Sequence, residues 1–153
     1  MEPGSSAEIH SPCRPVFEPP DDAKILVVDD DTTNSLILCG LLRTRGYRTC
    51  SVSNGYKALA MMSAYRFWAV FIDIRMPGID GFETIRRMRE LDLPHQPAAT
   101  RVVGVSASVE KSVLAKAEGF DAFLPKPVYG QDLSAVLALL NRLEPSRTRS
   151  GHS

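Results

Sequence analysis

The sequence lacks three features that would narrow its class at once: long apolar runs, paired cysteines and a net charge. No apolar stretch approaches the roughly 20 residues of a transmembrane helix, and the first residues lack the apolar core of a secretory signal. The three cysteines show no CxxC or Cys/His spacing, which favours a reduced, cytoplasmic setting with Cys39 and Cys50 as small core residues. Eighteen basic and eighteen acidic residues cancel, so no overall charge indicates nucleic acid or membrane as a partner.

The 153 residues are enough for one compact domain with short extensions. Residues 1–22 are rich in Pro, Ser and Gly without sustained periodicity, which predicts a flexible arm. Residues 144–153 have the composition of a frayed tail. We therefore expect a folded domain over residues 23–143.

Within this domain, short apolar runs alternate with segments of helical spacing. Strand character is found at 24–29, 47–52, 68–73, 101–107 and 122–127, and helical spacing at 33–45, 55–62, 82–91, 113–117 and 133–140. Strict alternation of five strand–helix units predicts an α/β fold, a doubly wound five-stranded parallel sheet with five helices. The second run is the most polar and suits an edge strand, whereas the first, third and fourth are apolar throughout and suit central strands.

Polar side chains follow the carboxyl ends of the predicted strands, where ligands bind in sheets of this kind. They are Asp29, Asp30 and Asp31 after the first strand, Asp73 after the third, Ser106 after the fourth and Lys126 after the fifth.

These residue types suit phosphoryl chemistry. Crowded carboxylates repel one another, and Mg²⁺ relieves the repulsion because it prefers oxygen ligands. Asp73 can attack phosphorus to form an acyl phosphate. Lys126 supplies a positive charge and Ser106 a hydroxyl donor for the oxygens of the transferred group.

Each residue also has a structural interpretation. Asp30 or Asp31 can cap the helix that begins near Thr32, and Asp80 before Gly81 is typical of turn or cap chemistry. Capping accounts for one aspartate but not for three, and four separate strand ends would have to converge by accident. The combined pattern favours a site.

The segments "ILVVDDD", "VFIDIRMPGIDGFE", "VVGVSAS" and "FLPKPV" occur in the order and spacing of the receiver domains of two-component response regulators. From about Lys24 to Leu143 the chain resembles this family, including its chemotaxis regulators. The resemblance implies the flavodoxin-like strand order 2-1-3-4-5. It also implies a domain that takes a phosphoryl group from a phosphohistidine on a histidine kinase or histidine phosphotransfer protein, and loses it slowly by itself.

The resemblance assigns roles residue by residue. Asp73 matches the phosphoacceptor, and Asp29 and Asp30 match the acidic pair that binds Mg²⁺ with Asp73 and the backbone carbonyl of Arg75. Lys126 matches the lysine that contacts the phosphoryl group, and the family implies a cis bond between it and the following proline.

The same resemblance implies how a signal leaves the site. Ser106 matches the hydroxyl residue that moves toward the phosphoryl group, and Phe123 matches the aromatic residue that then turns inward. The surface formed by the helix near 113–117, the strand at 122–127 and the helix at 133–140 would bind a downstream protein.

Two departures limit the transfer. Phe123 stands where the best-studied members have tyrosine, so a switch hydroxyl is absent, and Ser106 replaces the commoner threonine. Arg75 lies where the family tunes the lifetime of the phosphoryl group, and the sequence does not decide its effect. The segment "LDLPHQPAATR" is longer than in minimal receivers and resembles receivers of hybrid sensor kinases.

Two alternatives stay open. "DDDTT" also fits the DxDxT signature of haloacid-dehalogenase-type phosphatases, with Asp29 as nucleophile and Asp31 as acid/base, but only Asp132 and Glu144 follow Lys126 and Asp73 has no role there. A receiver-like interaction module that is never phosphorylated is the second, although such modules usually lose the acceptor or the acidic pair. Nucleic-acid binding has little support, because Arg86, Arg87 and Arg89 have the pattern of a solvated helix face.

Overall fold

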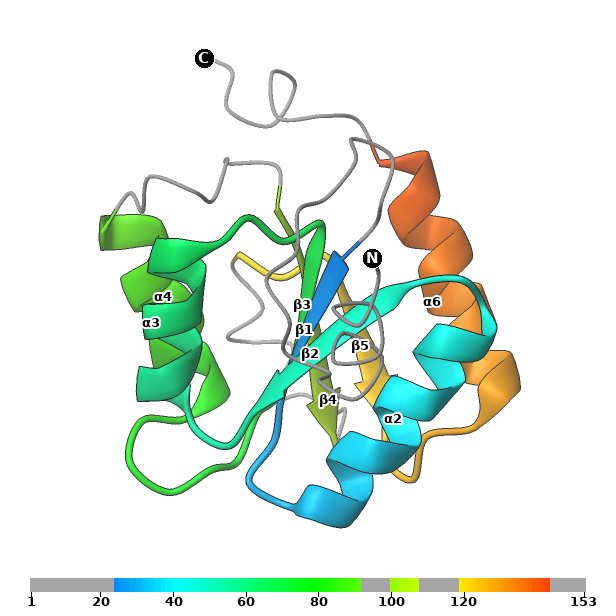
Figure 1. Cartoon of the computed structure of the whole chain (residues 1–153), viewed down its shortest axis with the longest axis horizontal. Coiled ribbons are helices and arrows are strands. Elements are labelled where there is room, and N and C mark those ends of the chain that lie inside the picture. Colours follow the sequence, from blue (N-terminus) through cyan, green and yellow to red (C-terminus); the bar gives the residue numbers. More distant parts are fainter. Residues whose placement is uncertain (1–23, 92–99, 108–118, 144–153) are drawn as a thin grey trace, which may run out of the picture.

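The computed structural model describes residues 24–91, 100–107 and 119–143. Strands and helices alternate from β1 to β4, as the sequence predicts, and Figure 1 shows the arrangement of the described elements. The elements are β1 (Lys24–Val28), α2 (Thr32–Thr44), β2 (Arg48–Val52), α3 (Gly55–Ala64), β3 (Ala69–Asp73), α4 (Gly81–Leu91), β4 (Arg101–Ser106), β5 (Ala122–Pro125) and α6 (Gly130–Arg142). The helix predicted near 113–117 and the extensions predicted at 1–22 and 144–153 lie outside the described residues.

The strands form one parallel sheet in the order β2-β1-β3-β4-β5. This confirms the predicted doubly wound, flavodoxin-like topology and the edge position of the second strand. Every residue of β1 and β3 is buried, which explains why their sequences are apolar along their whole length. The chain reverses direction across the sheet between β1 and β3, so the carboxyl ends of these two strands are the expected position of a ligand site.

Helices cover both faces of the sheet, with α3 and α4 on one side and α2 and α6 on the other (Figure 1). Each face has its own apolar core. The first packs α2 and α6 through Leu38, Leu42, Leu133, Leu137 and Leu140, and the second packs α3 and α4 through Ala58, Met62, Ile85 and Met88. Cys39 and Cys50 are buried, one in each core, without a disulfide, as predicted.

Local signals set the ends of the helices that border the strand ends. Asp31 caps α2 by accepting a hydrogen bond from the backbone N–H of Asn34 (3.1 Å), and Asn54 caps α3 by accepting one from Lys57 (2.8 Å). Gly46 follows the end of α2 with a φ of 92°, a conformation that glycine adopts without strain. The capping role considered for Asp31 is confirmed.

Candidate functional site

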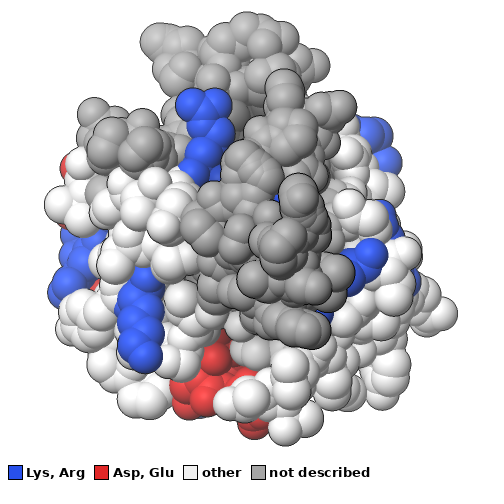
Figure 2. Space-filling view, in the orientation of Figure 1, with Lys and Arg blue, Asp and Glu red and all other residues white. Residues whose placement is uncertain are grey.

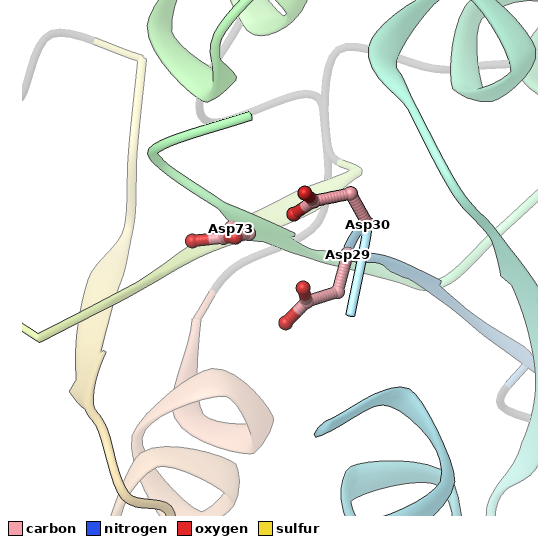
Figure 3. A group of neighbouring side chains, drawn as sticks. All are labelled: Asp29, Asp30 and Asp73. Atoms are coloured by element: carbon pink, nitrogen blue, oxygen red, sulfur yellow. The ribbon is translucent and has the colours of Figure 1, made fainter. Parts of the chain in front are cut away.

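Three aspartates converge at the carboxyl ends of β1 and β3. One carboxylate oxygen each from Asp29, Asp30 and Asp73 lies within 4.8 Å of the other two. Figure 3 shows Asp29 and Asp30 extending from the end of β1 and Asp73 from the end of β3, and Figure 2 shows acidic side chains gathered at this edge of the molecule. Asp29 and Asp73 are buried and Asp30 is exposed, so the group opens toward solvent on one side.

The Lys126 ammonium is the cationic partner of this group. Its Nζ lies 3.3 Å from Oδ2 of Asp29 and 3.2 Å from Oδ1 of Asp73. Lys126 reaches the site because β5 pairs with β4 and ends at Pro125. The Lys126–Pro127 bond is cis, as the resemblance implied. One ammonium therefore bridges the two buried carboxylates.

The environment shifts the pKa of both partners. Burial raises the pKa of Asp73, and repulsion by the Asp29 carboxylate adds to the increase, against the opposing effect of the Lys126 ammonium. Burial alone would lower the pKa of Lys126, but the Asp29 and Asp73 carboxylates outweigh it and the pKa is raised. The site thus holds more negative charge than its own lysine neutralises, which suits a divalent cation.

Ser106 lies on β4, which pairs with β3, and Phe123 lies on β5, the next strand beyond β4. Ser106 ends β4, is buried, and its backbone carbonyl accepts a hydrogen bond from the N–H of Lys126 (3.0 Å). The Phe123 ring stacks on Phe120 with centroids 5.2 Å apart, and it lies against Gly104, where a β-carbon would be 2.5 Å from Cε1 of the ring. Only a glycine at this place in β4 leaves room for the ring.

The chain that follows Asp73 folds back on the strand. The N–H of Arg75 donates to Oδ1 of Asp73 (3.3 Å), which places the peptide of Arg75 beside the carboxylate. Asp80 accepts a hydrogen bond from the backbone N–H of Glu83 (2.8 Å) and so caps α4, the role that the sequence favoured over metal binding.

The structure brings the predicted site residues to one edge of the sheet, with Asp29, Asp30, Asp73 and Lys126 in one group and Ser106 next to Lys126. Asp31 stays outside the group and caps α2. The sequence did not predict that the Phe123 ring packs against Gly104. An isolated glycine inside a strand often marks a place where another group lies close to the backbone. The glycine in "VVGVSAS" is such a residue.

Comparison with known proteins agrees with this geometry. Residues 25–138 match the sequence profile of the response regulator receiver domain. The chain is 34% identical over 119 residues to the hybrid signal transduction histidine kinase L of Dictyostelium discoideum, a match covering 74% of this chain and 7% of that protein. It is 35% identical over 121 residues to the sensor histidine kinase RcsC of Salmonella typhi, covering 78% and 12%. The chain therefore spans about a tenth of the length of these relatives.

Among solved structures, the fold matches the receiver domain of the sensor histidine kinase PA1611 from Pseudomonas aeruginosa PAO1 with a TM-score of 0.69. The two are 23% identical, and the match covers 78% of this chain and 98% of that one, which holds a magnesium ion in its active-site cleft. The chain belongs to the response regulator receiver domain family of two-component signal transduction, and its acidic group fits the phosphoacceptor site of such domains.

Proposed function

We propose that this domain accepts a phosphoryl group on Asp73 from a phosphohistidine of a histidine kinase or histidine phosphotransfer protein. The observation that carries the proposal is the joint position of the three carboxylates and Lys126 around the end of β3. Capping explains Asp31 but none of these four side chains, whereas phosphoryl transfer uses all of them.

In the proposed reaction, an oxygen of Asp73 forms a bond to phosphorus and the bond between phosphorus and the histidine nitrogen breaks. The electron pair of that bond stays on the imidazole, which takes a proton from solvent. Lys126 already contacts Oδ1 of Asp73, so its ammonium is placed to bind an oxygen of the incoming group. Later attack by water on the phosphorus returns the Asp73 carboxylate and inorganic phosphate.

The donor set fits Mg²⁺. Asp29, Asp30 and Asp73 offer three carboxylate oxygens within 4.8 Å of one another, and the exposure of Asp30 leaves room for the waters that Mg²⁺ retains. The backbone carbonyl of Arg75 would be a further ligand. When bound, the ion would neutralise the carboxylates and the charge of the transferred group.

Ser106 and Phe123 are proposed to transmit the change. The Ser106 hydroxyl would donate to a phosphoryl oxygen, and Phe123 would respond to its movement. The downstream partner is then a protein that binds around β5, α6 and the helix expected near 113–117.

We further propose a receiver spanning residues 23–143 that works in the cytoplasm. No helix in the described ranges is long and apolar enough to cross a membrane.

The mass of the intact protein after incubation with Mg²⁺ and acetyl phosphate tests the proposal. Wild type should gain the mass of one phosphoryl group, and Asp73→Asn should gain none. Asp29→Asn and chelation of Mg²⁺ should both weaken labelling. Asp31→Asn is the matched control, because asparagine also caps helices and Asp31 lies outside the carboxylate group, so its labelling should equal wild type.

Two outcomes would overturn the proposal. If Asp73→Asn keeps the label and Asp29 is essential, the chain works as a phosphatase of the DxDxT kind. If neither acetyl phosphate nor a phosphohistidine protein labels wild type, the domain is an interaction module.

A further inference from the structure

The segment between β3 and α4 has no regular secondary structure, yet it is firmly packed. Ile74, Met76 and Ile79 are buried, with exposures of 5%, 9% and 7%, while the residues between them are exposed. An irregular segment that buries every second or third side chain is held by the core beneath it. Arg75, whose carbonyl is a proposed ligand, lies inside this segment.

Backbone hydrogen bonds fix both ends of the segment, one to β4 and one between the two ends. The N–H of Ile74 donates to the carbonyl of Val105 on β4 (3.1 Å), and the N–H of Gly81 donates to the carbonyl of Ile74 (2.9 Å). Gly81 itself lies directly against β3, since a β-carbon there would be 2.7 Å from the carbonyl oxygen of Asp73. The segment is therefore closed into a short turn at the acceptor.

The middle of the segment is held from outside, by α3. A β-carbon at Gly55, the first residue of α3, would lie 2.6 Å from Cγ1 and 2.8 Å from Cδ1 of Ile79, and closer still to Oγ1 of Thr84. Thr84 is fully buried, and its hydroxyl donates to the carbonyl of Asp80 (2.8 Å). Ile79 thus occupies a hollow that exists only because residue 55 has no side chain.

We propose that Ile79 and Gly55 are positioning residues of the divalent-ion site. The packing of Ile79 against Gly55 fixes the path of the chain from Asp73 to α4, and thereby the position of the Arg75 peptide. A carbonyl ligand has no rotamer of its own, so only the path of the backbone sets its position. The inference rests on the proposed function for the identity of the ion, and it adds that α3, which supplies no ligand, controls the affinity.

The test measures Mg²⁺ affinity and stability separately. Amide and carbonyl NMR signals of Asp73, Arg75 and Gly81 are followed during titration with MgCl₂, and the same proteins are unfolded with urea. The variants are Gly55→Ala, which fills the hollow, Ile79→Ala, which empties it, and Ile79→Val, which keeps a branched side chain in it. Ala58→Gly is the matched control, because Ala58 is buried in the same helix and glycine weakens a helix interior.

Gly55→Ala and Ile79→Ala should raise the Mg²⁺ dissociation constant about tenfold, as removal of supporting groups around metal ligands does. Ile79→Val should bind nearly as wild type, and Ala58→Gly should lose stability with unchanged affinity. If Gly55→Ala does not fold, the comparison of Ile79→Ala with Ile79→Val decides the question.

The two proposals fail in different ways. Wild type that binds no Mg²⁺ would refute the ion site itself. Wild type that binds Mg²⁺, with Gly55→Ala and Ile79→Ala binding as tightly as wild type, would refute only the positioning role. Parallel losses of affinity in these variants and in Ala58→Gly would also refute it, because affinity would then follow general stability.

Discussion

Replacing Lys126 with methionine should destabilise the domain strongly in Mg²⁺-free buffer and much less when Mg²⁺ is present. Methionine has a similar length and an apolar stem, so the main loss is the ammonium that lies between Asp29 and Asp73. Those two carboxylates are buried and, without a cation, would face each other unneutralised.

The size of the effect follows from the geometry. Each contact of Nζ with a carboxylate oxygen, at 3.2 and 3.3 Å, corresponds to about 5 kcal/mol of attraction at an effective dielectric constant of about 20. Desolvation of the three groups offsets most of that attraction, and removing one partner of a buried pair costs about 3–5 kcal/mol. We expect the lower end, about 3 kcal/mol, because the Lys126 side chain is 20% exposed.

Mg²⁺ should restore much of this stability, since it supplies the missing positive charge. A Mg²⁺ concentration of about 100 times the dissociation constant contributes about 2.7 kcal/mol, and the variant should bind the ion more tightly because no ammonium competes.

The pKa of Lys126 is raised, so in wild type the stabilising charge is fully present below the ordinary value of 10.5 and is lost as the pH rises through the raised pKa.

Urea unfolding of wild type and Lys126→Met, with EDTA and with saturating MgCl₂, measures both effects. Lys57→Met is the matched control, because Lys57 is exposed at the same edge of the sheet and donates a hydrogen bond to Ser53 (3.4 Å). It should change stability little in either buffer. A loss below about 1 kcal/mol for Lys126→Met without Mg²⁺, or no recovery with it, would refute the charge argument.

Two further predictions concern the acceptor and the aromatic residue. The native pKa of Asp73 is raised above its ordinary value of 3.8. At pH values above the raised pKa, the ionised Asp73 carboxylate therefore lowers the free energy of unfolding, and this loss disappears as the pH falls below 3.8. Asp73→Asn should therefore be more stable than wild type to urea at neutral pH without Mg²⁺, and an advantage that persists below pH 3.8 would contradict this cause. Gly104→Ala should push the Phe123 ring by about 1 Å, since the added carbon would lie 2.5 Å from Cε1, at a net cost of about 1–2 kcal/mol. The ¹⁹F signal of a fluorinated phenylalanine at position 123 reports the movement. An unchanged signal in a variant of equal stability would show that the position of the ring does not depend on its contact with Gly104.

The strands and the main site residues could be predicted because the signals are local and the rule that joins them is general. Apolar runs such as "WAVFID" identify a buried strand without knowledge of its neighbours. The observed β3 begins one residue later than predicted and ends as predicted, at Asp73. Parallel strands then bring their carboxyl ends to one edge whatever their order, so Asp29, Asp73 and Lys126 were predicted to meet.

The contacts that adjust the site could not be predicted in this way. Gly55 follows the cap residue Asn54, and its sequence context indicates only the start of a helix. Its second role depends on how closely α3 approaches Ile79 and Thr84, which is set by packing between distant segments. For the same reason "RVVGVSA" predicts a strand but not which side chain fills the space above Gly104.

The order of the strands has a consequence for the folding of the chain. The acidic group and its lysine come from the ends of β1, β3 and β5, so no fragment shorter than residues 29–126 contains the whole site. Lys126 reaches Asp29 only after β5 has paired with β4, β4 with β3 and β3 with β1. A chain in which β5 has not paired therefore keeps the carboxylates of β1 and β3 but lacks the ammonium between them, and the contact of Lys126 with Asp29 and Asp73 reports that β1, β3, β4 and β5 have all joined.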